Sequence, residues 1–400
     1  MKRKLLMGGL IVAMLFVSGC WNRREMNDLA IAVAYGIDKA GDGYRLTVQV
    51  VDPGEVASQK GSTDRTPVTT YQATGETIFE ALRRMTKVSP RKIYNSHLRM
   101  LVISDKVAED GIANVLDFVS RNHEHRGDFY VVIAKDTTAS NTLKILTHLE
   151  SIPANQMYSS LETSERSWAP TSAVTLDELI DDIVSPGKQP AVTGLRIKGS
   201  QTTGENKRNV NEIASSTQLV YNGLAVFKKD KLIGWLNEEE SKAYNYIQDN
   251  VKSTVGVVYC PGGGNVALEV MHSATKVKGK VVHGKPTIDV SVRMRANIGE
   301  VRCSIDLSEE SSLKQLEQNG NRKVQQFIEE TIATVQKKYK VDIFGFGEVM
   351  HREQPKYWKT VQDDWDTQFQ TLAYRVNVEC EIRYLGTQSN SFLEEMDKKE

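Results

Sequence analysis

The residue whose chemistry is easiest to assign is Cys20, which follows the small residues Ser18 and Gly19. A thiolate is a strong nucleophile, and small neighbours leave the backbone beside it open to an enzyme. Before them, three cations at positions 2–4 precede an uncharged apolar run over residues 5–17. A cationic start, an apolar run and small residues before a cleavage point are typical of a secretory signal peptide.

The residues from Val17 to Cys20 resemble the bacterial lipobox, in which the cysteine sulfur receives a diacylglyceryl group and cleavage leaves that cysteine first. The apolar run is shorter than the roughly 20 residues that a membrane-spanning helix needs. We therefore predict a signal peptide over residues 1–19 and a lipid attachment, S-diacylglycerol with N-acylation, at Cys20. The alternatives are an ordinary signal peptide beside an incidental cysteine and an uncleaved anchor. Because two acyl chains bind a bilayer firmly, we expect the remaining chain at an extracytoplasmic membrane face.

The composition is that of a folded protein without a nucleic-acid partner. The chain has 400 residues, enough for two or three domains, of which 40% are hydrophobic and 26% charged. Its 51 basic and 51 acidic residues include the three cations of the signal peptide, so the mature part carries 48 against 51, a net charge of −3. Nucleic-acid binding requires a strongly basic face, which this balance does not indicate.

Three short motifs lack what their chemistry requires. Gly262-Gly263-Gly264 is not followed by the Lys and Ser/Thr of a phosphate-binding loop, and His123 and His125 are two residues apart where helical metal ligands are four apart. The acidic residues around Trp365 lack the spacing and the glycine of a calcium loop; they are Asp363, Asp364 and Asp366. No serine or cysteine stands in a nucleophile motif. We predict no catalytic residue, no metal and no cofactor.

Three cysteines remain besides Cys20. An odd number argues against a disulfide framework. Cys303 and Cys380 each lie on the apolar side of an alternating run, so we interpret them as small buried hydrophobes; a pair bonded across strands is the other option. The state of Cys260 stays open.

The expected fold class is α+β, or mixed α/β, with several domains. Strands alternate with amphipathic helices in a first domain over residues 20–150. Residues 29–38 and 44–51 flank Gly41-Asp42-Gly43, which predicts a hairpin. The further elements expected there are a strand over 68–73, a helix from Ile78 to Met85, a strand over 98–103, one helix capped at Ser104 that carries Ala108 to Val119, a strand over 129–134 and a short helix over 142–149.

A middle region or small domain is expected over residues 151–236, with a long polar loop over 199–216. The last domain, over residues 237–400, contains two runs in which every second residue is apolar, 287–296 and 374–384. Such runs are typical of an antiparallel sheet with one covered face. Apolar residues recur at helical spacing from Val324 to Tyr339, so we expect a long helix packed on that sheet.

The other face of this sheet is predicted to be charged. Arg293 and Arg295 on one strand and Glu379 and Glu381 on the other stand at cross-strand spacing. Mixed charges in such an arrangement usually face water; a docking face for a partner is the alternative.

Four stretches of the chain form a series that resembles one known family. They are Cys20-Trp21-Asn22-Arg23-Arg24-Glu25 with Gly36-Ile37-Asp38; His97-Leu98 with Arg121 and Arg126; residues 223–236, GLAVFKKDKLIGWL; and Asp342, Phe346-Gly347, Pro355, Trp358, Trp365 and Phe369. In this order they resemble the Ger(x)C family, the lipoprotein C subunits of nutrient germinant receptors in spore-forming bacteria.

The resemblance implies a subunit without catalytic activity, anchored through Cys20 on the outer face of the spore's inner membrane. It implies a complex with a membrane-embedded A subunit and a transporter-like B subunit, and a fold of several mixed α/β domains. It assigns no ligand-binding residue to this subunit, so direct nutrient binding stays open.

Two other functions fit parts of the sequence. A solute-binding lipoprotein that delivers a ligand to a transporter would show two similar α/β lobes around a cleft, which the alternating C-terminal strands disfavour. A surface hydrolase would need titratable groups clustered in a cleft, with His97 and Asp364 as residues to test.

Overall fold

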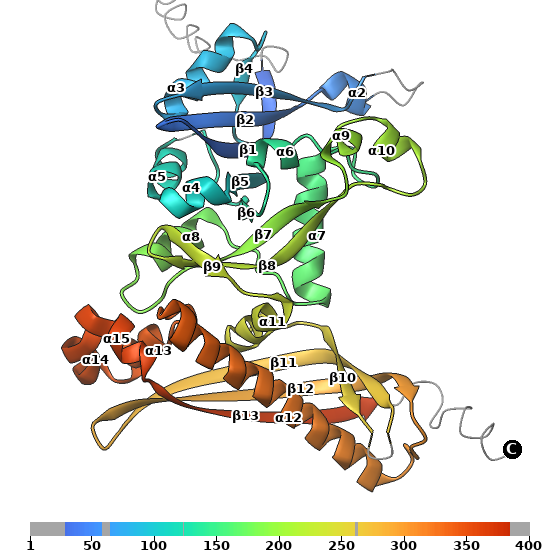
Figure 1. Ribbon diagram of the computed structural model, residues 1–400, viewed down its shortest axis with the longest axis vertical. Coiled ribbons are helices and arrows are strands. Elements are labelled where there is room, and N and C mark those ends of the chain that lie inside the picture. The colour runs from blue at the N-terminus through green and yellow to red at the C-terminus, as the bar shows by residue number, and fades with distance from the viewer. Residues whose placement is uncertain (1–28, 58–64, 123, 261–262, 385–400) are drawn as a thin grey trace, which may run out of the picture.

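A computed structural model describes residues 29–57, 65–122, 124–260 and 263–384. Two β-sheets form the body of the molecule: a nine-stranded mixed sheet built from the first part of the chain and a four-stranded sheet near the C-terminus. Figure 1 shows them at opposite ends of the long axis, with the four-stranded sheet at the bottom. The mixed α and β class predicted from the sequence is confirmed.

The predicted N-terminal hairpin is present. β1 (Leu29–Ala40) pairs antiparallel with β2 (Gly43–Val51), and β2 pairs with β3 (Val68–Gly75). Gly41 adopts φ +61°, a left-handed conformation that suits glycine in a tight turn. The short α2 (Pro53–Ala57) follows β2, and α3 (Ile78–Arg84) begins at Thr77, whose hydroxyl accepts from the N–H of Glu80.

Three parallel strands continue this sheet: β4 (Lys92–Tyr94) and β5 (Met100–Ser104) both pair with β1, and β6 (Tyr130–Ala134) pairs with β5. The single helix expected after Ser104 is in fact two, α4 (Asp105–Asp110) and α5 (Ala113–Arg121). The chain turns at Gly111, with φ +131°, because the N–H of Ile112 donates to the carbonyl of Asp230 at 2.9 Å and not to a preceding helical carbonyl.

The helix expected over residues 142–149 is wrong. Only α6 (Ala139–Thr142) forms, since the N–H of Leu146 donates to the carbonyl of Gly204 at 2.9 Å instead of continuing a helix. Four more helices follow: α7 (Pro153–Ser167), α8 (Leu176–Val184), and the one-turn α9 (Gln201–Gly204) and α10 (Arg208–Asn211), which lie within the predicted polar loop.

Strands from the middle of the chain complete the nine-stranded sheet. β7 (Ala191–Lys198) is parallel to β6, and β8 (Gln218–Lys228) and β9 (Lys231–Trp235) add antiparallel, so the order is β3-β2-β1-β5-β6-β7-β8-β9 with β4 beside β1. Described residues from both of the first two predicted domains, 20–150 and 151–236, therefore contribute strands to one sheet. The division into domains over 20–150, 151–236 and 237–400 stays a prediction.

The C-terminal sheet has the order β10-β11-β12-β13, formed by β10 (Thr254–Tyr259), β11 (Asn265–Val282), β12 (Lys285–Arg302) and β13 (Ala373–Tyr384). The first three strands are antiparallel, but β12 and β13 are parallel, which corrects the expected antiparallel pairing of the two alternating runs. A parallel pair needs a crossover connection, and the chain between these strands supplies one made of helices.

That crossover contains α12 (Glu310–Thr334), continued by a π-helical turn (Val335–Tyr339), and then α13 (Phe346–Glu353), α14 (Pro355–Val361) and α15 (Trp365–Gln370). The predicted long helix on the sheet is confirmed: the buried side chains of α12 join the core of β10 to β13. Figure 1 shows α12 running diagonally across this sheet, with α11 (Glu238–Ile247) between the two sheets.

Cys260 and Cys303 form a disulfide, with their Cα atoms 6.5 Å apart. The interpretation of Cys303 as a buried hydrophobe is therefore wrong: β12 ends at Arg302, and Cys303 meets Cys260 beyond the end of β10. Cys380 is a buried thiol without a disulfide partner, as predicted, and its burial raises the pKa of the thiol to about 12.

Candidate functional site

The residues weighed as chemical sites do not assemble into one. Cys20, His123 and Gly262 lie outside the described residues. The ring Nδ1 of His125 lies 3.1 Å from the carbonyl of Val119, and burial lowers the pKa of this imidazole. Among the residues that the structure describes, no three His, Cys, Asp or Glu side chains are grouped to hold a metal ion.

The hydrolase candidates are also separated. His97 is an exposed residue just before β5, whereas Asp364 lies beside α15 in the other half of the molecule. The carboxylate of Asp364 accepts from the hydroxyl of Thr367 at 2.7 Å, and Asp366 pairs with Lys228 at 3.1 Å. Asp364 thus makes a contact within its own segment, and Asp366 an ion pair with the end of β8, so neither carboxylate is placed with His97.

Asp342 is the centre of the family-like residues near the C-terminus. Its Oδ1 accepts from the N–H groups of Phe344 and Gly345, both at 3.0 Å. Its Oδ2 accepts from the N–H of Gly347 at 2.8 Å and the indole N–H of Trp365 at 2.9 Å. Burial raises the pKa of Asp342 to about 6, while these N–H donors act in the opposite direction.

Aromatic rings surround this carboxylate. Phe346 lies 5.2 Å from Phe344 and 6.4 Å from Phe369, and Trp358 meets Trp365 edge-on at 5.3 Å between ring centres. Because aromatic pairs and buried hydrogen bonds both fix geometry, this cluster holds α13, α14 and α15 in a single packed group. The structure thus brings together in space residues that the family resemblance related only by their order along the chain.

The same cluster joins the two halves of the molecule. The N–H of Gln189 donates to the carbonyl of Asp342 at 2.7 Å. A Cβ on Gly187 would lie 2.6 Å from the N of Glu348, and a Cβ on Gly347 would lie 2.6 Å from the Cα of Gly187. The two backbones therefore touch where only glycine fits. We call this contact, formed by Asp342, Gly347, Trp365, Gly187 and Gln189, the Asp342 junction.

A second family-like stretch, residues 223–236, supports the same connection. It forms the β8–β9 hairpin, and the hydroxyl of Tyr339 donates to the carbonyl of Trp235 at 2.6 Å. A Cβ on Gly234 would lie 2.4 Å from the ring of Tyr339, so this glycine admits the ring against β9. Both contacts connect the nine-stranded sheet to the end of α12.

The third stretch, Gly36-Ile37-Asp38, organises the N-terminal sheet. The carboxylate of Asp38 is buried and accepts from the N–H groups of Ala139 and Ser140, both at 2.8 Å. A Cβ on Gly36 would approach the backbone of Ala139 to 3.1 Å. This stretch therefore holds the start of α6 against β1.

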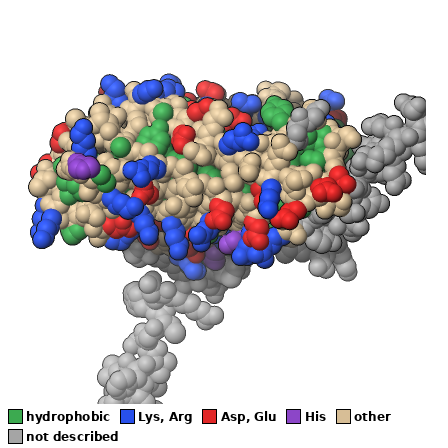
Figure 2. Space-filling model, turned by 90° about the horizontal axis from the view of Figure 1, so that it is seen from below, with side chains coloured by type: hydrophobic (Ala, Val, Ile, Leu, Met, Phe, Trp, Pro, Cys, Tyr) green, Lys and Arg blue, Asp and Glu red, His purple; other side chains and the backbone are tan. Residues whose placement is uncertain are grey.

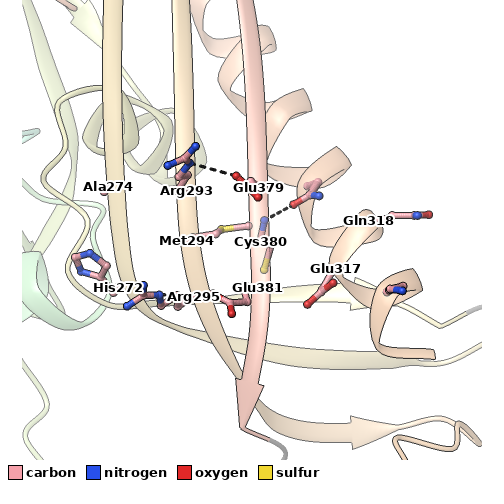
Figure 3. A pocket seen from close by; sticks show the side chains of 12 residues that line it. His272, Ala274, Arg293, Met294, Arg295, Glu317, Gln318, Glu379, Cys380 and Glu381 are labelled. Carbon is pink, nitrogen blue, oxygen red and sulfur yellow. Dashed lines mark hydrogen bonds and ion pairs between the residues drawn. The ribbon is translucent and has the colours of Figure 1, made fainter. Parts of the chain in front are cut away.

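The predicted charged face of the C-terminal sheet is confirmed. Arg293 pairs with Glu379 at 3.2 Å and Arg295 with Glu381 at 3.6 Å, between residues directly opposite each other on β12 and β13. Both pairs are among the lining residues of a groove of about 810 Å³, and side chains from the first half of α12, which lies beyond β13 in Figure 3, also line it. Acidic and basic groups alternate over this end of the molecule (Figure 2), so no single sign of charge dominates it.

One basic segment of the surface was not predicted from the sequence. Residues 83–92, which we call the basic turn, contain five cations and no carboxylate; the cations are Arg83, Arg84, Lys87, Arg91 and Lys92. The segment leads from the end of α3 to β4, beside a groove of about 500 Å³ with Phe79 and Phe118 among its lining residues. A local charge count would have found it, since the whole-chain balance conceals it.

No described helix has the combination of length and apolar character that a bilayer crossing requires.

Comparison with known families assigns both halves of the chain. A family model described as "Spore germination protein N-terminal domain" matches residues 22–197. A second, "Spore germination B3/ GerAC like, C-terminal", matches residues 222–386. The two matches together span most of the chain and include the Asp342 junction.

Individual relatives agree with these matches. The chain is 31% identical over 399 residues to spore germination protein KC of Bacillus subtilis (strain 168), covering 98% of both chains, and 23% identical over 385 residues to spore germination protein B3 of the same organism, covering 94% and 96%. The crystal structure of the GerBC protein matches with a TM-score of 0.53 at 19% identity, covering 87% of this chain and 96% of that one, which shows a shared fold. The chain belongs to the GerAC-like family of spore germination proteins, the C subunits of germinant receptors, and its role is in spore germination.

Proposed function

We propose that this chain is a lipoprotein, attached through Cys20 to the outer face of the spore's inner membrane, and that it works as a non-catalytic subunit of a nutrient germinant receptor. The observation that carries this proposal is family membership over both halves of the chain, combined with a lipobox-like sequence that ends at Cys20. The expected partners are the membrane-embedded A subunit and the transporter-like B subunit.

The disulfide supports an extracytoplasmic location. Disulfides persist in oxidising compartments and are rare in the reducing cytosol. The bond between Cys260 and Cys303 closes a segment with a sequence separation of 43. An exported chain reaches an environment in which such a bond can form, as the signal peptide predicts.

An interaction role fits the use that the fold makes of its family-like residues. Asp342, Trp365 and Asp38 are buried and engaged in hydrogen bonds that hold backbone segments together. A catalytic acid or base must instead reach a substrate. These residues build a rigid body with two sheets, suited to presenting surfaces to partner subunits.

The anchor is tested with spores that carry Cys20→Ala. We expect the protein to leave the membrane fraction in an immunoblot and the spores to lose the response to one class of nutrient in a panel of amino acids and sugars. Ser18→Ala, which keeps a small residue before the cysteine, is the matched control and should change neither readout. Loss from the membrane with every nutrient response intact would contradict the receptor role; to exclude masking, the strain should lack its other receptors.

The absence of catalysis has its own test. His97→Ala and Asp364→Ala alter the two residues that a surface hydrolase would use, and both lie at positions where folding should survive. Normal germination of both variants is the expected result. Loss of germination by a variant that still folds and reaches the membrane would favour the hydrolase.

A further inference from the structure

The basic turn is a fixed structure with its cations directed outward. Met85 and Ser89 are buried, and the N–H groups of Val88 and Ser89 both donate to the carbonyl of Met85, at 3.0 and 2.8 Å. The hydroxyl of Ser89 donates to the carbonyl of Arg91 at 2.7 Å. The residues between these buried points are therefore held at the surface.

Most of its positive charge is unbalanced. Arg84 pairs with Glu80 at 2.5 Å, and Lys92 pairs with Glu124 at 2.6 Å. The other three cations, Arg83, Lys87 and Arg91, are exposed and form no ion pair with any residue in the described ranges. Three outward cations without carboxylate partners form a local site for anionic groups.

An apolar side chain stands among these cations. Val88 is 61% exposed, with Lys87 directly before it and Arg91 three residues after it. An exposed aliphatic side chain with cations on both sides of it in the sequence suits a membrane surface, where the apolar group can enter the headgroup region and the cations can meet lipid phosphates.

The turn also lies where the chain comes from the membrane. Leu29, the first residue of β1, pairs with Lys92 of the turn, and Leu29 is only nine positions after Cys20. Nine steps along the chain reach at most about 30 Å when fully extended. Figure 1 shows α3 and β4 at the end of the molecule away from the C-terminal sheet, so a lipid on Cys20 brings this end toward the bilayer.

We infer that the basic turn is a second membrane contact, which binds the headgroups of anionic phospholipids through Arg83, Lys87 and Arg91 and places Val88 at the bilayer surface. This inference rests on the proposed anchor at Cys20 for its location. The acyl chains at Cys20 hold the chain at the bilayer but leave it free to rotate, and a basic patch beside the anchor adds electrostatic attraction to anionic lipids. It also orients the chain, with the C-terminal sheet directed away from the membrane.

The test uses the mature chain from residue 20, carrying Cys20→Ser so that no lipid contributes. Its sedimentation is measured with vesicles of phosphatidylcholine alone and with vesicles that contain phosphatidylglycerol. We expect binding only to the anionic vesicles and its loss at high salt. Each cation near an anionic surface strengthens binding by roughly fivefold, so Arg83→Gln, Lys87→Gln and Arg91→Gln together should weaken it on the order of a hundredfold.

A matched control removes the same charge elsewhere. Lys276, Lys278 and Lys285 are exposed lysines without ion pairs in the described ranges, on the β11–β12 hairpin at the other end of the molecule. Their joint change to Gln should leave vesicle binding almost unaltered. Val88→Ser should weaken binding severalfold without changing the unfolding midpoint, since the side chain is exposed.

Three outcomes would overturn the inference. They are equal or absent binding to both kinds of vesicle, equal losses in the two triple variants, and normal vesicle binding by the basic-turn triple. Absent vesicle binding together with weaker germination of the basic-turn triple would indicate a protein partner at the turn instead. The Cys20→Ala spores test the anchor with the turn intact, and the vesicle assay tests the turn without the anchor, so either proposal can fail alone.

Discussion

The side-chain oxygen of Asn321 in α12 accepts a hydrogen bond from the backbone N–H of Cys380 in β13 at 2.7 Å. One helical turn earlier, the carboxylate of Glu317 accepts from the N–H of Ile382 at 2.8 Å. β13 is an edge strand, and these N–H groups point away from the sheet. Side chains of the helix thus occupy the hydrogen-bonding positions that a further strand would take.

At the opposite edge of the sheet, side chains of the same helix act as hydrogen-bond donors. The amide of Asn319 donates to the carbonyl of Tyr259, and the ammonium of Lys323 donates to the carbonyl of Val257, both at 2.8 Å. These carbonyls belong to β10, the other edge strand. Acceptors on one flank of α12 and donors on the other therefore close both edges of the sheet.

Removing one of these contacts should expose an edge. In Asn321→Ala the N–H of Cys380 loses its acceptor, so we expect the free energy of unfolding to fall by about 1 kcal/mol and self-association to increase. Urea unfolding and light scattering at several protein concentrations measure the two effects. Gln318→Ala, at an exposed position of the same helix, should change neither; equal behaviour of the two variants would contradict a protective role for Asn321.

Replacing two different glycines by alanine should change the stability of the protein in opposite directions. A Cβ on Gly320 in α12 would find its nearest neighbour at 3.6 Å, an ordinary contact, so Gly320→Ala should stabilise the protein by about 0.5–1 kcal/mol through helix propensity. A Cβ on Gly347 would lie 2.6 Å from both Gly187 and Trp365, so Gly347→Ala should cost about 1–3 kcal/mol. Thermal unfolding of both variants checks the pair, and a loss in both would show that Gly320 is also needed for packing.

Local signals predicted the parts of the fold that depend on neighbouring residues. The β1–β2 hairpin follows from Gly41-Asp42-Gly43 between two apolar runs, and the cap at Ser104 follows from its place before a helix. Alternation identified β12 and β13 because it reports which face of a strand is buried. It does not report strand direction, which is why the parallel pairing of β13 was missed.

The remaining features depend on contacts between distant segments. Gly187 and Gly347 are 160 positions apart in the sequence. Glycine is required at both positions because their backbones touch in the fold, and the sequence does not show this contact. Cys260 and Cys303 pair because the ends of β10 and β12 converge, which spacing alone does not give. The resemblance contained Asp342, Gly347 and Trp365 of the Asp342 junction, but it did not indicate that these residues contact Gly187 and Gln189.

The carboxyl of Asp342 should make stability depend on pH. Its pKa is raised to about 6 in the folded state, above roughly 3.9 in an unfolded chain. The folded state therefore binds the proton more tightly, so this group's contribution to stability is largest below about pH 4 and is lost as the pH rises through 6. Between pH 7 and pH 5 it should add about 1 kcal/mol to the free energy of unfolding.

Comparison with Asp342→Asn isolates that contribution, because other groups titrate alike in both proteins. The difference in unfolding free energy between the wild type and this variant should increase from pH 7 to pH 5, measured by urea unfolding. Asp363→Asn, at an exposed carboxyl two residues from Trp365, is the control and should show the same difference at both pH values. A difference for Asp342→Asn that stays constant would contradict the raised pKa.

Reduction should weaken the C-terminal half of the molecule. A crosslink stabilises mainly by restricting the unfolded chain, and a sequence separation of 43 between Cys260 and Cys303 corresponds to about 2–4 kcal/mol. We expect a reducing agent to lower the urea midpoint of the wild type and of Cys380→Ala to the same extent, since Cys380 takes no part in the bond. The double variant Cys260→Ala with Cys303→Ala should start at the lower midpoint and not respond to the reductant. A further fall in its midpoint on reduction would contradict this origin of the effect.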